Sequence, residues 1–190
     1  MSILITGGAG YIGSHVALNL IDNGFKPIII DNLITGSKKL IPKEANYVYG
    51  DIKDHDLVKN IIIDNEVDTV IHLAASTFVA ESVLDPYKYY NNNTLNSIDL
   101  IVLCGKLKIK NFIFSSTAAC YGSKHKSKVC EDYDLRPESP YGNSKLAAEL
   151  ALSDLSQIYK FNYGIFRYFN VAGSDPKSRS GSIQNPASHL

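Results

Sequence analysis

The sequence predicts an α/β fold in which a doubly wound parallel sheet carries helices on both faces. Short apolar runs alternate with stretches of helical periodicity from residue 3 to residue 167. A glycine cluster joins the first apolar run to the first helical stretch. The run at residues 68–75 is nearly all apolar, which is typical of a central parallel strand buried on both faces. The resulting βαβαβαβαβαβ order indicates a parallel sheet.

The junction of the first strand and first helix carries a signal for a phosphate ligand. Gly7, Gly10 and Gly13 lie between an apolar run at residues 3–5 and a helix that continues to about residue 21. Such a turn points unpaired N–H groups and the positive end of the helix dipole at one place, and glycines let a phosphate approach. A bare tight turn also needs glycine. The next strand decides in favour of a pyrophosphate site.

The second strand, residues 27–30, ends in an acidic residue, Asp31. An acid about 20 positions beyond the glycines is where a dinucleotide-binding fold places its ligand for the adenosine ribose hydroxyls. The same carboxylate repels a 2′-phosphate. We therefore expect NAD(H) as the cofactor, in preference to NADP(H).

A polar loop at residues 32–37 and a short helix precede the third strand, residues 45–49. Asp51 follows that strand, and the next helix is expected from about residue 54 to residue 65. Asp51 has two compatible interpretations. It caps this helix, or it meets an adenine amino group.

The fourth strand, residues 68–75, contains His72 and ends in Ala74 and Ala75. We interpret His72 as a packed residue behind the site, and the two alanines as small residues that let a cofactor pass close to the backbone. A long helix is expected from Pro86 to about Lys106, because proline is favoured in a first helical turn.

The fifth strand, residues 111–117, ends in hydroxyl side chains, which places Thr117 at the ligand-facing edge of the sheet. Residues 118–140 read as a polar loop, and its basic run at 124–128 as solvated surface. Ser139 and Pro140 begin a further helix, and residues 161–167 form the sixth strand. From residue 174 the composition predicts loop. The pattern as a whole is that of a Rossmann fold.

Tyr141 and Lys145 are four residues apart on this helix and so share one face. A free tyrosine has a pKa of about 10, so a tyrosine base at neutral pH needs a shift of roughly three units. A neighbouring ammonium and a cationic nicotinamide both stabilise a phenolate. An isolated match of this kind is usually ordinary helix surface. Here it follows a dinucleotide loop and a strand that ends in Thr117.

Composition excludes several classes of function. The chain has 190 residues with 19 basic and 19 acidic side chains, and no basic stripe with interleaved aromatics, so nucleic acid is not expected as a partner. No apolar stretch has the length of a membrane span, and we expect a cytoplasmic protein. The three cysteines lack metal-ligand spacing, so no metal is expected, and Cys104 is interpreted as helix packing.

Together these motifs resemble the extended short-chain dehydrogenase/reductases, and within them the epimerases of nucleotide sugars. The resemblance covers nearly the whole chain. It rests on TGGAGYIGSH (6–15), DNL (31–33), GD (50–51), HLAA (72–75), YYNNN (89–93), FSSTAACYG (114–122), SPYGNSK (139–145) and RYFNVAG (167–173).

The resemblance implies catalysis by Tyr141, Lys145 and Thr117, with Thr117, Tyr141 and Asn170 at the substrate. Tyr141 would take the proton of the sugar 4-hydroxyl while a hydride passes from C4 to NAD, and a 4-keto sugar would turn over. A further set of residues is implied to contact the cofactor. They are Gly7, Gly10, Tyr11, Ile12, Gly13, Asp31, Asn32, Asp51, Ile52, Leu73, Ala74, Ala75, Asn93, Ser115, Tyr141, Lys145 and Phe169.

The implied substrate is a UDP-hexose, with interconversion of UDP-galactose and UDP-glucose favoured over UDP-N-acetylglucosamine or another nucleotide sugar. The related 4,6-dehydratases carry an Asp-Glu pair after the threonine, where this chain has Ala118 and Ala119. Without those carboxylates the elimination of water has no acid or base.

The expected domain division is an NAD-binding unit at residues 1–173 that carries the catalytic residues, followed at 174–190 by the start of an incomplete substrate-binding region. A rival hypothesis is a truncated NAD-binding remnant without catalysis. By family analogy, the helices that begin near Pro86 and Tyr141 could pair in a homodimer.

Overall fold

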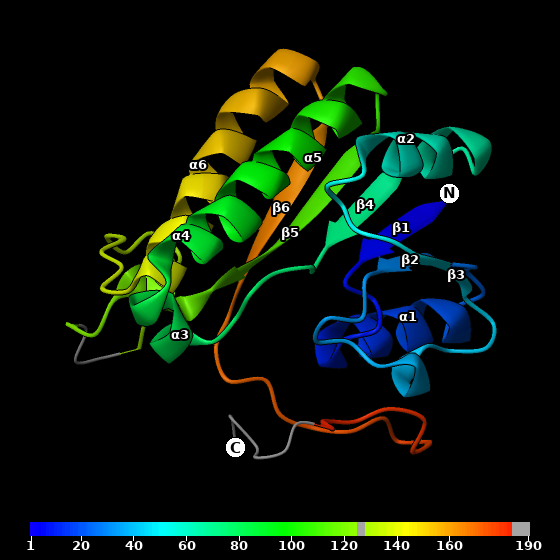
Figure 1. Ribbon diagram of the computed structural model, residues 1–190, viewed down its shortest axis with the longest axis horizontal. Coiled ribbons are helices and arrows are strands. Elements are labelled where there is room, and N and C mark those ends of the chain that lie inside the picture. Colours follow the sequence, from blue (N-terminus) through cyan, green and yellow to red (C-terminus); the bar gives the residue numbers. More distant parts are fainter. Residues whose placement is uncertain (125–127, 184–190) are drawn as a thin grey trace.

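The computed structural model describes residues 1–124 and 128–183 (Figure 1). Within them, six parallel strands form one sheet in the order β3-β2-β1-β4-β5-β6. Their bounds are β1 Ile3–Thr6, β2 Ile28–Asp31, β3 Asn46–Tyr49, β4 Thr69–His72, β5 Asn111–Thr117 and β6 Asn162–Tyr168. The strand order reverses between β1 and β4. Ligands of doubly wound sheets bind at such a switch point, outside the carboxyl ends of the strands.

The helices are α1 Tyr11–Asp22, α2 His55–Asp64, α3 Val79–Leu84, α4 Pro86–Tyr89, α5 Asn96–Lys106 and α6 Pro140–Tyr159. Short 3₁₀ segments occupy Lys38–Leu40 and Ala118–Tyr121. The doubly wound parallel fold that the sequence predicts is confirmed.

Alternating strand residues build two cores, one on each face of the sheet. Leu4 and Val70 point to the face that α2, α5 and α6 cover. Ile5 and Ile71 point to the opposite face, where α1 packs. In Figure 1 these helices accordingly lie on two sides of the strands. Cys104 is fully buried in the larger core, which confirms its packing role.

The structure corrects the expectation of one uninterrupted helix from Pro86 to Lys106. The π-helical segment Tyr90–Leu95 joins α4 to α5. Such a segment rotates side chains relative to a regular helix, and Asn93 is turned fully inward here. The short helix α3 lies between β4 and α4, where the sequence pattern predicts no element.

The capping interpretation of Asp51 is wrong. The cap of α2 is Asp54, whose side chain accepts a hydrogen bond from the Leu57 N–H at 3.0 Å. Asp51 instead accepts from the Lys53 N–H at 3.0 Å and from the Asn32 amide at 2.8 Å. Asp51 stands three residues too early to satisfy the first N–H groups of the helix.

The segment after β6 returns to α1 and is fastened to its last turn. Arg179 reaches Asp22 at 2.7 Å and Asp175 at 2.8 Å, and Lys177 reaches Asp22 at 3.1 Å. The Ser180 and Ser14 hydroxyls lie 2.6 Å apart. In Figure 1 this orange-to-red segment runs beneath the sheet toward α1.

The basic run expected as solvated surface is described in part. Lys124 and Lys128 are exposed, as expected. Residues 125–127 lie outside the described part of the chain.

Gly13→Ala should destabilise the fold more than Gly10→Ala. A Cβ on Gly13 would lie 2.3 Å from the Gly7 carbonyl oxygen and 2.7 Å from Gly8 Cα, whereas a Cβ on Gly10 would lie 3.3 Å from that oxygen. Overpacking against backbone typically costs about 1–3 kcal/mol. Urea denaturation of both variants gives their free energies of unfolding. Equal losses of stability would show that the backbone around Gly13 can move to accommodate the added methyl group.

Arg179→Gln should speed amide hydrogen exchange in residues 174–182 while β1–β5 stay protected. The effect should be below about tenfold, because partly exposed ion pairs are weak and screened by salt. The control is Arg136→Gln, which removes an exposed pair with Asp134.

The difference in hydrogen exchange between the parent and Arg179→Gln should depend on pH. Hydrogen bonding by Arg179 lowers the pKa of Asp22 to about 2 from its ordinary 3.8. A lowered carboxyl pKa stabilises the folded form above the ordinary value, and this is lost as pH falls through the lowered one. The difference in protection between parent and Arg179→Gln should therefore shrink as pH falls toward about 2. Arg179 also lowers the pKa of Asp175, which stays charged at that pH, so part of the difference should remain. A difference that does not shrink at all would show that the Asp22–Arg179 pair does not hold the segment.

Candidate functional site

A cleft of about 520 Å³ opens at the carboxyl ends of the strands, at the switch point between β1 and β4. It brings together most of the residues that the sequence predicts. Those that line it are Gly7, Gly10, Tyr11, Ile12, Gly13, Asp31, Leu73, Ala74, Ala75, Ser115, Thr117, Tyr141, Lys145, Phe169 and Asn170.

The glycine turn presents the start of α1 to this cleft. Gly7 has a φ of +71°, and a Cβ there would lie 2.7 Å from the Ala74 backbone nitrogen. Gly7 and Gly13 are therefore needed for internal packing. Gly10 caps α1 without any side chain, and the first turn holds no acid. The first N–H groups of α1 thus face the cleft with their partial positive charge.

Asp31 lies beside that turn at the end of β2 and is 8% exposed. Its carboxylate accepts from the Ala9 N–H at 3.0 Å and from the Leu33 N–H at 2.8 Å. A carboxylate has about four acceptor positions, so capacity remains for ligand hydroxyls. The two backbone contacts fix its orientation toward the cleft.

The opposite wall carries Thr117, Tyr141 and Lys145. Thr117 ends β5, and its hydroxyl accepts from the Ala119 N–H at 3.1 Å. Helix α6 begins at Pro140, where the Ser139 hydroxyl accepts from the Gly142 N–H at 3.1 Å. This cap places Tyr141 in the first turn and Lys145 one turn later. Lys145 is 2% exposed, and its ammonium lies 4.6 Å from the centre of the Phe114 ring.

Burial opposes charge on both α6 side chains. It raises the pKa of Tyr141, while a hydrogen bond with Thr117 acts in the opposite direction. Burial lowers the pKa of Lys145 to about 8, although charge interactions with Cys120 and Glu149 act to raise it. The expectation that Lys145 depresses the Tyr141 pKa is not met in this structure, where desolvation dominates. Lys145 still carries its proton at neutral pH.

His72 lies behind the cleft and is fully buried. Its ring nitrogens lie 2.7 Å from the Thr6 hydroxyl and 2.9 Å from the Ser97 hydroxyl. Burial lowers its pKa to about 3, so it is neutral. The packing role expected from the sequence is confirmed.

Four residues expected at the cofactor are absent from the described lining of the cleft: Asn32, Asp51, Ile52 and Asn93. Ile52 is buried in the larger core. Asn93 binds the Ser76 backbone, with its oxygen 2.8 Å from the N–H and its nitrogen 2.9 Å from the carbonyl. It thereby holds the loop after β4. Direct cofactor contacts of these four stay predictions.

Other lining residues are not among the predicted contacts with cofactor or substrate, namely Thr35, Thr77, Phe78, Val79, Ser116, Ala118, Ala119, Tyr168, Val171, Ala172, Gly173 and Ser182. Several of them belong to a wall made by the chain after β6. The Tyr11 hydroxyl donates to the Gly173 carbonyl at 2.6 Å, across 162 positions of sequence. A contact between residues so far apart in the sequence leaves no local pattern from which it could be predicted.

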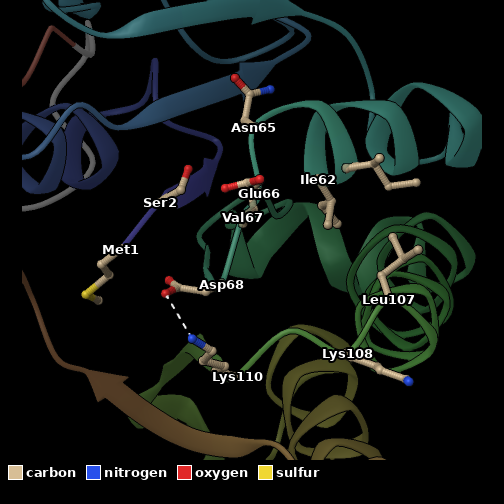
Figure 2. Close-up of a pocket in the computed structure, with 11 residues that line it drawn as sticks. Met1, Ser2, Ile62, Asn65, Glu66, Val67, Asp68, Leu107, Lys108 and Lys110 are labelled. Carbon is tan, nitrogen blue, oxygen red and sulfur yellow. Dashed lines mark ion pairs between the residues drawn. The ribbon is translucent and has the colours of Figure 1, made fainter.

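A second cavity, of about 560 Å³, lies at the opposite, amino ends of the strands (Figure 2). Met1, Ser2 and Asp68 line it, and Lys110 extends toward the Asp68 carboxylate at 3.9 Å. It contains none of the predicted site residues. Across the described residues no group of His, Cys, Asp and Glu is arranged to hold a metal ion, and no helix there is long and apolar enough to cross a membrane.

Comparison with known proteins places this geometry in a family. A UDP-glucose 4-epimerase of Azospirillum brasilense is 44% identical over 188 residues, which is 99% of this chain and 54% of that protein. A UDP-glucose 4-epimerase from Brucella ovis has been solved in complex with NAD, and this chain superposes on it with a TM-score of 0.95 at 39% identity. The superposition covers 100% of this chain and 58% of the Brucella ovis chain.

The UDP-Glc/GlcNAc 4-epimerase from Campylobacter jejuni superposes with a TM-score of 0.85 at 42% identity, and covers 90% of this chain and 54% of its own. The chain spans about half the length of the curated relatives it matches. The model of the NAD dependent epimerase/dehydratase family matches residues 3–186. The chain therefore belongs to the NAD dependent epimerase/dehydratase family.

Proposed function

We propose that this chain carries the NAD site and the catalytic residues of a UDP-sugar 4-epimerase that interconverts UDP-galactose and UDP-glucose. The observation that carries the proposal is the convergence of Thr117, Tyr141 and Lys145 on one wall of a cleft whose other wall holds Asp31 and the start of α1. The division into an NAD-binding unit at 1–173 and a substrate-binding region from 174 is part of the proposal.

The cleft fits NAD on observations of the structure itself. The uncapped start of α1 and the open approach at Gly10 suit a pyrophosphate. The remaining acceptor capacity of Asp31 suits a ribose diol, and its charge disfavours a 2′-phosphate. When bound, NAD would accept a hydride from sugar C4 and return it to the other face of the 4-keto sugar.

Tyr141 would remove the proton of the sugar 4-hydroxyl, and Thr117 would hydrogen-bond that hydroxyl. Burial makes Tyr141 a neutral phenol at neutral pH, because its pKa is raised. The positive charge of an oxidised nicotinamide would favour the phenolate, so that Tyr141 becomes a base in the loaded site. The Lys145 ammonium would donate hydrogen bonds to the hydroxyls of the nicotinamide ribose.

Two neighbouring residues complete the proposal. Phe169 is 65% exposed and lines the cleft beside Asn170. Phe169 would cover the nicotinamide, and Asn170 would bind the phosphates of the nucleotide sugar. The dehydratase alternative is disfavoured because, among the described lining residues, Asp31 is the one carboxylate. Ala118 and Ala119 occupy the places where water elimination needs an acid and a base.

UDP-N-acetylglucosamine is a second candidate substrate, since the Campylobacter jejuni relative is named for both sugars. A cytoplasmic location fits three free cysteines in the described chain, two of them buried. A homodimer through α5 and α6 also belongs to the proposal. The direct test of function is to add UDP-galactose to the purified, NAD-loaded protein and detect UDP-glucose.

Tyr141→Phe should lower the turnover of UDP-galactose by roughly 100-fold or more, because a general base contributes about 10²- to 10⁴-fold. Affinity for NAD should stay within a small factor, since the ring is retained. Tyr87→Phe is the control, because Tyr87 is 76% exposed. Turnover and NAD binding are measured on the same preparations. A Tyr141→Phe rate comparable with the parent rate would remove Tyr141 from the role of base.

Asp31→Asn should weaken NAD by roughly 10- to 100-fold, because hydrogen bonds to a charged group contribute about 1.5–3 kcal/mol. NADP should lose less, since repulsion of its 2′-phosphate disappears as well. Asp56→Asn on α2 is the matched control, as its side chain is exposed. Calorimetric titration with both cofactors gives the ratio. Equal losses for the two would contradict ribose recognition by Asp31.

A further inference from the structure

A buried carboxylate lies one helical turn beyond Lys145, and no step proposed above uses it. Glu149 is 3% exposed on α6. It pairs with the Arg167 guanidinium, whose Nη2 lies 2.7 Å from Oε2 and whose Nε lies 3.1 and 3.2 Å from the two oxygens. It also accepts a hydrogen bond from the Ser116 hydroxyl. The carboxylate therefore has fixed partners on both oxygens.

These partners come from the elements that carry the site. Ser116 lies on β5 directly before Thr117, and Arg167 lies on β6 two residues before Phe169. Arg167 extends the network to the Tyr121 hydroxyl at 3.1 Å, and the Tyr121 ring stacks on Phe169 at 6.5 Å. Glu149 thus joins α6, β5 and β6 beneath the cleft.

Stability alone is a poor reason for such a pair. Taking two charges out of water costs several kcal/mol per ion, and a well-packed apolar pair is often as stable. A carboxylate at this depth acts on its neighbours through a medium that screens charge weakly. Lys145 and Glu149 are both buried and stand four residues apart on α6, so their side chains share one face of the helix. The negative charge of Glu149 raises the pKa of Lys145.

The surroundings of Lys145 are otherwise poor in negative charge. Tyr141 and Glu149 approach it along α6, Cys120 from the segment Ala118–Tyr121, His72 from β4 and the Phe114 ring from β5. Tyr141, Cys120 and His72 are neutral at pH 7, because burial raises the first two pKa values and lowers the third. Glu149 is the charged group of this set that favours an ammonium.

We propose that Glu149 is a positioning residue of the epimerase site: held by Arg167 and Ser116, it supplies the buried negative charge that keeps Lys145 an ammonium. The function of that ammonium rests on the function proposed above, whereas its charge state does not. Glu149 acts through Lys145 and touches neither cofactor nor sugar.

The test is a direct titration of Lys145 in the full 190-residue chain. Lysine labelled with ¹³C at Cε is incorporated, and the Lys145 signal is identified by its loss in Lys145→Arg. In the parent its midpoint should lie near pH 8. In Glu149→Gln the midpoint should fall by roughly one unit or more, since nearby charges shift a pKa by about 1–3 units.

Two further variants separate charge from shape. Glu149→Asp keeps the charge and should keep the midpoint close to the parent value. Asp154→Asn removes an exposed carboxylate from the same helix and should leave the midpoint unchanged. If Glu149→Gln fails to fold, the double variant Glu149→Gln with Arg167→Gln is compared with Arg167→Gln alone. The two differ only in the charge of residue 149, and the double variant should have the lower midpoint.

A midpoint in folded Glu149→Gln equal to that of the parent, or in the folded double variant equal to that of Arg167→Gln, would overturn the proposal and leave Glu149 with a purely structural role. So would an equal fall in Asp154→Asn. NAD titration over the same pH range is run in parallel on every variant. If the Lys145 midpoint moves as expected but the parent protein does not bind NAD, the inference about Glu149 stands and the proposed function fails.

Discussion

The close packing of the glycine turn is the constraint on which the cleft depends. A Cβ on Gly7 would strike the backbone of Ala74, and a Cβ on Gly13 would strike the carbonyl of Gly7. These contacts bring β1, the end of β4 and the start of α1 within touching distance. The Gly7 N–H also donates to the Ile30 carbonyl at 2.9 Å, which brings the end of β2, and hence Asp31, to the same place. The start of α1 and the Asp31 carboxylate, which we propose bind the pyrophosphate and a ribose, are therefore brought together by one packing arrangement.

On the opposite wall, burial disfavours the charged forms of Tyr141 and Lys145, the forms that the proposed chemistry uses. Tyr141 is held as a phenol and Lys145 is driven toward a neutral amine. A site built this way responds strongly to any charge placed nearby, because weak screening in the interior magnifies it. Fixed charges of the protein and the charge of a bound ligand can then each determine the protonation state of one of these residues. Catalytic groups with shifted pKa values commonly arise from such a balance.

How much the sequence could predict follows from the range of the interactions involved. The strands were predictable because a short apolar run is a local signal. The start of α6 was predictable because the cap Ser139 and the first-turn Pro140 act within a few residues. The meeting of Asp31 with the glycine turn followed from fold topology. The π-helical segment did not, because it is fixed by Asn93 binding Ser76 and Ser144 on other elements. The raised pKa of Tyr141 could not be predicted for a similar reason. The spacing of four residues indicates that Lys145 is close, but it does not show how deeply Tyr141 is buried.

The return of the chain to α1 connects two parts of the cleft that the sequence places far apart. Helix α1 also donates a hydrogen bond from the Tyr11 hydroxyl to the Gly173 carbonyl, and Asp22 in its last turn pairs with Arg179. Between β6 and these anchors lie Phe169 and Asn170, which have no regular secondary structure to hold them. Their position is therefore set at one end by β6 and at the other by α1. A displacement of α1 would therefore be transmitted to Phe169 and Asn170, so the proposed contacts with the cofactor and with the substrate both depend on the position of this helix.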